Sequence, residues 1–285
     1  MTLIEKIKLL RELTGAGMMD CKKALQENGE DVDKAKDWLR EKGITTAAKK
    51  SGRIAAEGLS FAKISDGYAA IVEVNSETDF VSRGDAFKAL VEEVLDLLLA
   101  KKPATKEEAD AIINPLIVEA TVKIGEKLSF RRFEVIKAGN NAATYIHMGG
   151  KIATVVLLDK EDHELAHGLA MHVAANNPSY ITAKDISQAE YDHEKHIQLE
   201  LAKNDPKLAD KPVAMLEKIL EGKIKKHFSD LVLVDQTYLM DDSKKVDAVL
   251  KEKGINVLKF VRFQVGEGIE KRQEDFASEV LGQIK

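Results

Sequence analysis

The 285-residue chain contains very little cysteine and no long apolar segment. Cys21 is its only cysteine, which excludes an intramolecular disulfide and indicates a reducing compartment. No run of residues is long and apolar enough to span a bilayer. The first eight residues alternate charged and apolar side chains, unlike a signal peptide. We therefore expect a cytoplasmic protein with no membrane partner.

The chain also lacks a strong excess of either charge. Its formal net charge is -5 and it has no long basic tract, so we expect no direct nucleic-acid partner. Hydrophobic residues make up 44% and charged residues 32%, which is typical of a soluble globular protein rich in helix. At this length the chain can form more than one hydrophobic core.

Most sequence motifs of catalysis are missing. There is no glycine-rich phosphate loop, no G-x-S-x-G and no cysteine pair for a metal. Residues 163–167 do fit H-E-x-x-H, the zinc peptidase pattern. The extended pattern is not met, because Gly168 falls two places early and His172 one place early. We expect no enzyme, no metal and no cofactor; a zinc peptidase that uses His163, Glu164 and His167 is the alternative.

Residues 1–53 are predicted to form a small helical domain followed by a linker. Three short helices are expected up to Gly43, with Trp38 supplying much of a thin core. The basic, weakly apolar residues 47–53 indicate the linker. Met18 and Met19 are adjacent on a predicted helix and cannot face the same way, so one is expected to be exposed and available to a partner.

After residue 53 the same order of elements occurs twice: a hairpin, then helix, then a closing strand. The two closing strands, residues 130–135 and 260–265, both read F-x-R-F-x-V. We therefore predict an α+β fold with a duplicated core and antiparallel sheets. The expected elements are strands 59–64, 68–74, 128–135, 145–148, 152–158 and 257–265, with helices from 86, at 105–124, at 165–175 and at 243–253. The two core subdomains span residues 54–139 and residues 140–178 with 229–265.

Two further segments complete the predicted organisation. Residues 179–228 are highly charged and are expected to form an inserted helical hairpin or coiled coil, with helices at 187–203 and 213–228 and a turn at 204–207. Residues 266–285 form a C-terminal module with a helix at 276–284.

Residues 75–82 join a predicted strand to a predicted helix. Such a corner is expected to be a polar surface loop, yet it carries Phe80 beside Asp79. One interpretation is that Asp79 caps the helix and Phe80 packs back on its first turns. The other is that the Phe80 ring is exposed for a partner.

The chain resembles the bacterial elongation factor Ts family at three separated places. Thr78, Asp79, Phe80 and Val81 match its T-D-F-V signature. Residues 14–25, T-G-A-G-M-M-D-C-K-K-A-L, resemble its N-terminal signature, and G-E-G-I-E-K from residue 266 resembles its C-terminal module. Leu13 departs from the family pattern, in which an arginine is common just before T-G-A-G.

This resemblance implies a guanine nucleotide exchange factor for elongation factor Tu. It implies an N-terminal domain with a ubiquitin-associated-like fold that docks on the partner's GTPase domain. It also implies that the T-D-F-V residues dislocate Mg²⁺ from the nucleotide site. The implied partner-binding residues are Thr78, Asp79, Phe80 and Val81, then Arg11, Met18 and Met19 in the N-terminal domain, and His147 in the second subdomain. A hydrogen-bonded strand-end role for His147 stays open, as does a general adaptor built on the N-terminal domain.

Overall fold

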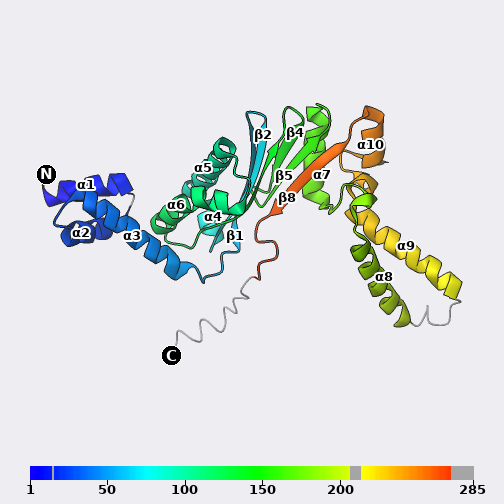
Figure 1. Cartoon of the computed structure of the whole chain (residues 1–285), viewed down its shortest axis with the longest axis horizontal. Coiled ribbons are helices and arrows are strands. Elements are labelled where there is room, and N and C mark those ends of the chain that lie inside the picture. Colours follow the sequence, from blue (N-terminus) through cyan, green and yellow to red (C-terminus); the bar gives the residue numbers. More distant parts are fainter. Residues whose placement is uncertain (15, 206–212, 271–285) are drawn as a thin grey trace. The chain divides into compact units, whose positions relative to one another are not determined.

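The structure is a computed structural model that describes residues 1–14, 16–205 and 213–270 (Figure 1). Its described residues form ten α-helices and three small sheets, two of three strands and one of two strands. The predicted α+β class is therefore confirmed. The chain divides into two units: residues 1–136 with 148–152 and the segment from 263, and residues 137–147 with 153–262. None of the described helices is both long enough and apolar enough to cross a membrane.

The first unit begins with three helices, α1 (Leu3–Thr14), α2 (Met18–Glu27) and α3 (Val32–Lys50). Leu10, Cys21 and Leu25 are fully buried between them. Trp38 is only partly buried at the edge of this cluster. The expectation that Trp38 supplies much of the core is therefore wrong, because the aliphatic side chains fill the centre and leave the indole at the rim.

Helix α3 is longer than the sequence predicted. It does not stop at Gly43, and it includes residues 47–50 of the expected linker. Gly43 is buried, and a Cβ at this position would lie 3.0 Å from Cγ2 of Val122 in α6 (Lys106–Ile124). The glycine therefore allows close packing of α3 on α6, and this tertiary contact outweighs its weak helix propensity.

The first sheet has the strand order β1 (Glu57–Ser65), β2 (Tyr68–Ser76), β3 (Ser129–Lys137). Strands β1 and β2 are antiparallel and pair from Ser65 with Tyr68 to Glu57 with Ser76. Asp66 and Gly67 form the two-residue turn, and both have positive φ, as the tight hairpin requires. This register brings β2 into the centre of the sheet, where nearly all of its residues are buried.

Two helices cover the core of the first sheet, α6 and α5 (Asp85–Lys101). Thr105 caps α6 and accepts a hydrogen bond from the Glu108 backbone N–H at 3.2 Å, and Gly125 ends the helix with φ 86°. These bounds match the predicted helix 105–124. The largest fully buried side chains that α5 and α6 contribute to this core are Phe87, Leu95, Leu98 and Ile113, and β2 adds Ala70, Val72 and Val74.

Glu73 in β2 is a fully buried carboxylate with four hydrogen-bond donors. It accepts from Nη1 of Arg131 at 2.9 Å, Nε of Arg132 at 2.5 Å and Nδ2 of Asn75 at 3.0 Å. The backbone N–H of Gly266 donates the fourth bond at 2.8 Å. Burial raises the pKa of Glu73, but the bonds from Gly266, Asn75 and Arg131 outweigh it, so the pKa lies below its usual value. The ionised side chain thus fastens the segment after residue 263 to the first sheet.

The second unit is built on the sheet order β4 (Ala142–His147), β5 (Ile152–Leu158), β8 (Val257–Gln264). Helices α7 (His163–Asn176) and α10 (Val246–Lys253) supply its other core residues. The helix predicted at 243–253 begins only at Val246. Residues 243–245 belong instead to β7 (Asp241–Lys245), which pairs with β6 (Thr237–Tyr238).

His172 of α7 is the buried polar centre of this unit and has no exposed surface. Its Nδ1 accepts a hydrogen bond from the Leu239 backbone N–H at 3.1 Å, so the proton is on Nε2, which contacts Oε1 of Gln236 at 2.8 Å. Burial lowers the pKa of His172, partly opposed by the bond to Gln236. The imidazole is therefore neutral in the folded unit.

The inserted helices are α8 (Gln188–Lys203) and α9 (Val213–Leu231), which run antiparallel to one another (Figure 1). The rings of Tyr191 and Phe228 stack with their centroids 5.9 Å apart. Further along the two helices, Ala202 is buried with Leu220. Short 3₁₀ turns at Ala183–Asp185 and Leu233–Asp235 flank the two helices. The predicted helices agree with α8 and α9, and α9 is three residues longer at its end. The predicted turn at 206–207 and the helix at 276–284 lie outside the described residues.

Candidate functional site

The corner after β2 is a short helix, α4 (Asp79–Arg83), rather than the predicted loop. Thr78 is its N-cap, and Oγ1 of Thr78 accepts a hydrogen bond from the Val81 backbone N–H at 3.4 Å. Asp79 is therefore the first helical residue and not the cap. Gly84 ends α4 and also caps α5. Residues 75 and 76, expected in the loop, are buried at the end of β2.

The Phe80 side chain points into solvent. It is 84% exposed, the highest value among the large hydrophobic side chains. Its neighbour Val81 packs against the core of the first unit, and Ser82 is buried. The interpretation in which Phe80 packs back on the helix is therefore wrong, because Val81 occupies that inward position. An exposed aromatic ring on a helical turn is a feature of protein-binding surfaces.

Asp79 pairs with Arg83 at the opposite end of α4. Oδ2 of Asp79 lies 2.8 Å from Nη2 of Arg83, and both side chains are substantially exposed. The carboxylate also stands in the first turn of the helix, where negative charge is favourable. Asp79 is thus held beside Phe80 without being buried.

Two residues far along the chain hold the start of α4. The carboxylate of Glu126 accepts hydrogen bonds from the backbone N–H and the hydroxyl of Thr78. Glu77 accepts from the Lys127 backbone N–H at 2.5 Å and from Nη1 of Arg53 at 3.2 Å. Sequence analysis missed these contacts, since nothing in the local pattern relates residues 77–78 to residues 126–127.

The N-terminal candidates are all at the surface. Met18 is 58% exposed and Met19 is 72% exposed, so both methionines, rather than one, face solvent. They occupy the first turn of α2, ahead of its buried residues Cys21 and Leu25. Arg11 is also exposed.

His147 ends β4 and is half-buried. Its Nδ1 lies 3.1 Å from the Tyr145 hydroxyl, so the side chain is hydrogen-bonded as a strand-end histidine would be. Tyr145 also contacts the edge of the His167 ring, with centroids 5.9 Å apart. These three side chains form one aromatic surface on the second unit.

The H-E-x-x-H motif lies at the exposed start of α7. Asp162 caps the helix by accepting from the Leu165 backbone N–H at 2.9 Å, and His163 pairs with Glu161 at 3.2 Å. His172 is buried and already uses both ring nitrogens. Within the described residues, no group of three or more metal-ligating side chains is assembled. The geometry therefore offers the motif no third ligand among those residues.

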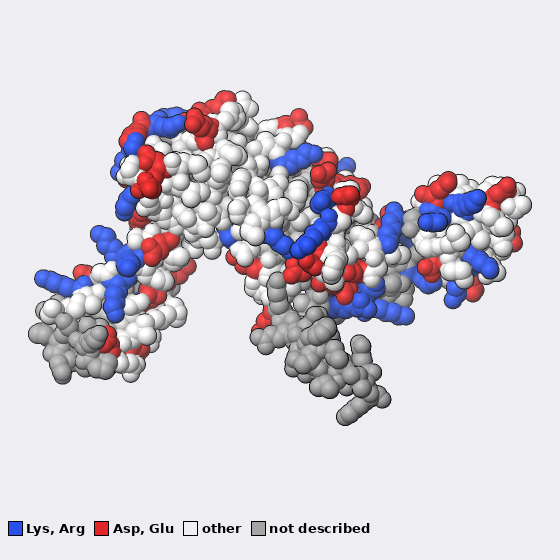
Figure 2. Space-filling model, turned by 180° about the vertical axis from the view of Figure 1, so that it is seen from behind, with Lys and Arg blue, Asp and Glu red and all other residues white. Residues whose placement is uncertain are grey.

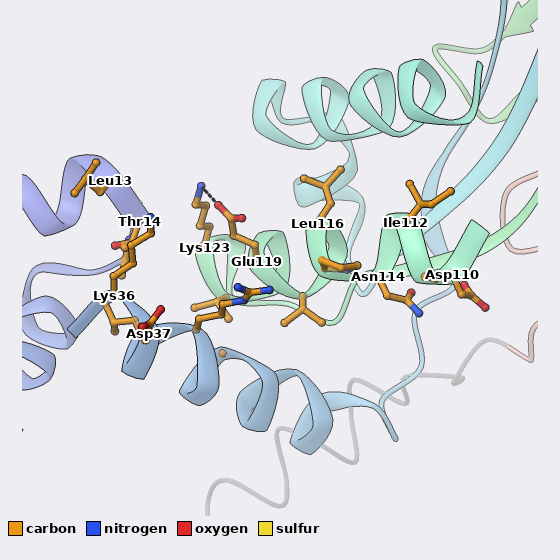
Figure 3. A pocket seen from close by; sticks show the side chains of 18 residues that line it. Leu13, Thr14, Lys36, Asp37, Asp110, Ile112, Asn114, Leu116, Glu119 and Lys123 are labelled. Carbon is orange, nitrogen blue, oxygen red and sulfur yellow. Dashed lines mark hydrogen bonds and ion pairs between the residues drawn. The ribbon is translucent and has the colours of Figure 1, made fainter. Parts of the chain in front are cut away.

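A pocket with a volume of about 860 Å³ lies between helices α1 and α3 on one side and helix α6 on the other (Figure 3). Ile112 and Leu116 contribute apolar surface to it, and the charged wall includes the pair Glu119–Lys123, whose atoms are 2.7 Å apart. Among the described residues, its lining contains no histidine, cysteine or serine.

Charge does not gather strongly on the face shown in Figure 2. Acidic and basic side chains are intermingled in several places on that face, and a broad area of it carries neither charge.

Exposed aromatic and methionine side chains on helical turns are typical of surfaces that bind other proteins. A family model described as Elongation factor TS matches residues 77–267, which is more than half of the chain. The chain therefore belongs to the elongation factor Ts family, and so to the translation elongation factors. The matched range contains α4, His147 and the inserted helices, and it does not contain α1–α3.

Proposed function

We propose that this protein is a guanine nucleotide exchange factor that binds elongation factor Tu in its GDP-bound form and promotes GDP release. The single observation that carries this proposal is the 84% exposed Phe80 ring, which stands on the capped helix α4 within the range matched by the family. GTP then rebinds to the emptied partner during translation elongation. The chain itself makes and breaks no bond and needs no cofactor.

Exchange of this kind is a problem of coupling free energies. A nucleotide held at about nanomolar affinity is bound by roughly 12 kcal/mol. Each tenfold acceleration of its release needs about 1.4 kcal/mol. A protein without catalytic groups supplies this free energy by binding the nucleotide-free partner more tightly than the loaded partner. The contact surface must therefore fit a distorted nucleotide site.

The α4 turn is suited to produce that distortion. Phe80 would insert between helices of the partner's GTPase domain, where burial of the ring gains free energy only after those helices move apart. Asp79, beside it, would disturb the polar contacts around Mg²⁺ and its waters. Thr78 and Val81 act from within this protein, since one caps α4 and the other packs on the core.

Other surfaces would hold the complex together. Arg11, Met18 and Met19 would anchor the partner's GTPase domain, and His147 would contact a second partner domain. In architectural terms we propose a ubiquitin-associated-like domain in residues 1–53 and a duplicated α+β core. The equal strand order of the two sheets supports that duplication, and the antiparallel α8 and α9 support a helical hairpin insertion. The location we propose is the cytoplasm.

The proposal is tested by following release of a fluorescent GDP from elongation factor Tu after mixing with this protein and excess unlabelled GDP. We expect the release rate to rise with the concentration of this protein and then to saturate. The acceleration should be smaller at high Mg²⁺, because Mg²⁺ stabilises the loaded state. A release rate that does not depend on the added protein would overturn the proposed function.

A further inference from the structure

We infer that Glu126 is a positioning residue that fixes the direction in which α4 presents Phe80. The inference rests on the proposed function for its effect on nucleotide release, and it rests on contacts in the first unit for its geometry. Glu126 belongs to the turn between α6 and β3, and is separated from Thr78 by 48 residues in the sequence.

The Glu126 carboxylate binds Thr78 through both of its oxygens. Oε2 accepts from the Thr78 backbone N–H at 3.0 Å, and Oε1 accepts from the Thr78 hydroxyl at 2.6 Å. The Thr78 hydroxyl therefore donates its proton to the hydrogen bond with Glu126. The remaining lone pairs of the hydroxyl oxygen face the Val81 backbone N–H at 3.4 Å. The carboxylate thus sets the orientation of the group that caps α4.

A second contact reinforces the first from the neighbouring residue on each segment. The Glu77 carboxylate accepts from the Lys127 backbone N–H at 2.5 Å, so residues 77–78 and 126–127 are joined in both directions. Gly125 has φ 86°, in the left-handed region that favours glycine. This conformation ends α6 and turns the following two residues toward the end of β2.

Residues 77–78 and 126–127, with the hydrogen bonds between them, form a clamp on the start of α4. This clamp matters because α4 has only five residues. A helix of this length forms too few internal hydrogen bonds to be stable by itself. Its direction depends on Thr78 at the start, on Val81 packed against the core, and on Gly84 at the end. The Phe80 ring is not fixed by packing of this kind, since it is 84% exposed. Loss of the clamp would therefore leave the ring present but free to take several directions.

The expected consequence is a reduced maximal release rate with little change in binding. Glu126→Ala should lower the maximal stimulated release rate about tenfold, because each decade corresponds to about 1.4 kcal/mol of lost coupling. The concentration for half-maximal stimulation should change by less than about twofold, since the proposed anchors are elsewhere. Glu126→Gln keeps one acceptor oxygen, so its maximal release rate should lie between those of Glu126→Ala and the unmodified protein. Glu119 is an exposed carboxylate of α6 that pairs with Lys123. Glu119→Ala is therefore the matched control and should behave like the unmodified protein.

A double-mutant cycle separates positioning from a general effect on folding. In a Phe80→Ala background, Glu126→Ala should cause almost no further loss, because the group that it positions is already absent. Additive losses would overturn the inference, since Glu126 would then act independently of Phe80. Thr78→Ser and Thr78→Val extend the cycle: the serine keeps the hydroxyl and should retain most of the activity, and the valine should resemble Glu126→Ala.

A readout that needs no partner completes the test. Trp38→Phe removes the only tryptophan, and Phe80→Trp then places a single fluorophore on α4. Time-resolved anisotropy should show a larger amplitude of fast local motion in the Glu126→Ala version than in the parent or the Glu119→Ala control. An unchanged amplitude in a folded Glu126→Ala or Glu126→Gln sample would overturn the inference. If the unmodified protein fails to accelerate GDP release, the proposed function fails, and this measurement still decides the clamp.

Discussion

Phe80 and Val81 are consecutive residues of one helical turn, and their side chains lie in opposite environments. The Phe80 ring is 84% exposed, whereas Val81 packs against the core of the first unit. The Val81 backbone N–H donates the capping hydrogen bond to Oγ1 of Thr78, so the inward residue also fixes the turn. Recognition and folding are thus assigned to neighbouring side chains, and substitutions can test them separately.

Phe80→Ala should slow stimulated GDP release by about tenfold to a thousandfold, since truncating an interface anchor typically costs 2 kcal/mol or more. The free protein should keep its melting temperature, because the ring is in solvent. Val81→Ala should show the reverse and lower the free energy of unfolding by about 1–2 kcal/mol. Release kinetics and thermal melts on the same samples check both. A Phe80→Ala variant that is unstable but exchanges normally would remove this turn from the mechanism.

Asp79→Ala should also slow release, by the loss of a charge directed at the partner's Mg²⁺ site. Its effect on the free protein should be below about 0.5 kcal/mol, because the exposed Asp79–Arg83 pair adds little stability and Thr78 provides the cap. Arg83→Ala breaks the same ion pair and serves as the control. Chemical denaturation and release assays on both variants give the comparison. Equal slowing by the two substitutions would assign the effect to the pair rather than to the carboxylate of Asp79.

Replacing both Met18 and Met19 with alanine should raise the concentration needed for half-maximal stimulation by about tenfold, if each contributes a modest interface contact. The melting temperature should change little, because both side chains are more than half exposed. Leu25→Ala, at a fully buried position of the same helix, should instead destabilise the N-terminal helices by about 2–5 kcal/mol. A double variant with unchanged concentration dependence would exclude this surface from binding.

Protein purified without chelator should contain no stoichiometric zinc. The reason is geometric: His163 and His167 are exposed on α7, and no third ligand is assembled with them among the described residues. Elemental analysis measures the metal content directly. One tightly held zinc per chain that disappears in His167→Ala would favour the peptidase alternative.

The second unit should lose stability on mild acidification because of His172. Its folded pKa lies below the unfolded value of 6.5, so the unfolded chain takes up a proton first as the pH falls. The free energy of unfolding should therefore decrease from about pH 6.5 downward, until the folded pKa is reached. His172→Gln should be less stable at pH 7.5 but should lose less on acidification. His167→Gln, at an exposed position of the same helix, controls for the removal of a histidine, and denaturation between pH 7.5 and 5 measures the slopes.

Local signals explain which parts of the fold could be predicted. The predicted bounds 105–124 agree with α6, because the Thr105 cap and the left-handed Gly125 that end this helix act within one turn of the chain. The end of α3 was not predictable, since it depends on the approach of Gly43 to Val122 in another helix. Strand β7 was missed because its residues, D-D-S-K-K, carry no apolar alternation and are paired only through β6.

The site was predictable to a different degree at each residue. The family resemblance pointed to Phe80, but the residue pattern allowed either an Asp79 cap with Phe80 packed back on the helix or an exposed Phe80 ring, and so left the direction of the ring open. The structure places the cap on Thr78, and the ring then faces solvent. Glu126 gave no sequence signal, because its contact with Thr78 spans 48 residues and involves ordinary surface residue types. Long-range hydrogen bonds of this kind are set by tertiary structure alone.

The hydrogen bond from the Gly266 N–H to Glu73 also affects the order in which the first unit folds during synthesis. The two residues are 193 positions apart, so Glu73 leaves the ribosome long before the last of its four donors exists. Until then the Glu73 carboxylate of the nascent first unit must either stay hydrated or become buried with one donor missing. Burial in that state costs the folding free energy that is typical of an unsatisfied charged group. The hydrogen bonding of the unit that presents Phe80 is therefore completed only after residue 266 has been synthesised, and a chain that terminates before that residue would leave the Glu73 carboxylate without its fourth donor.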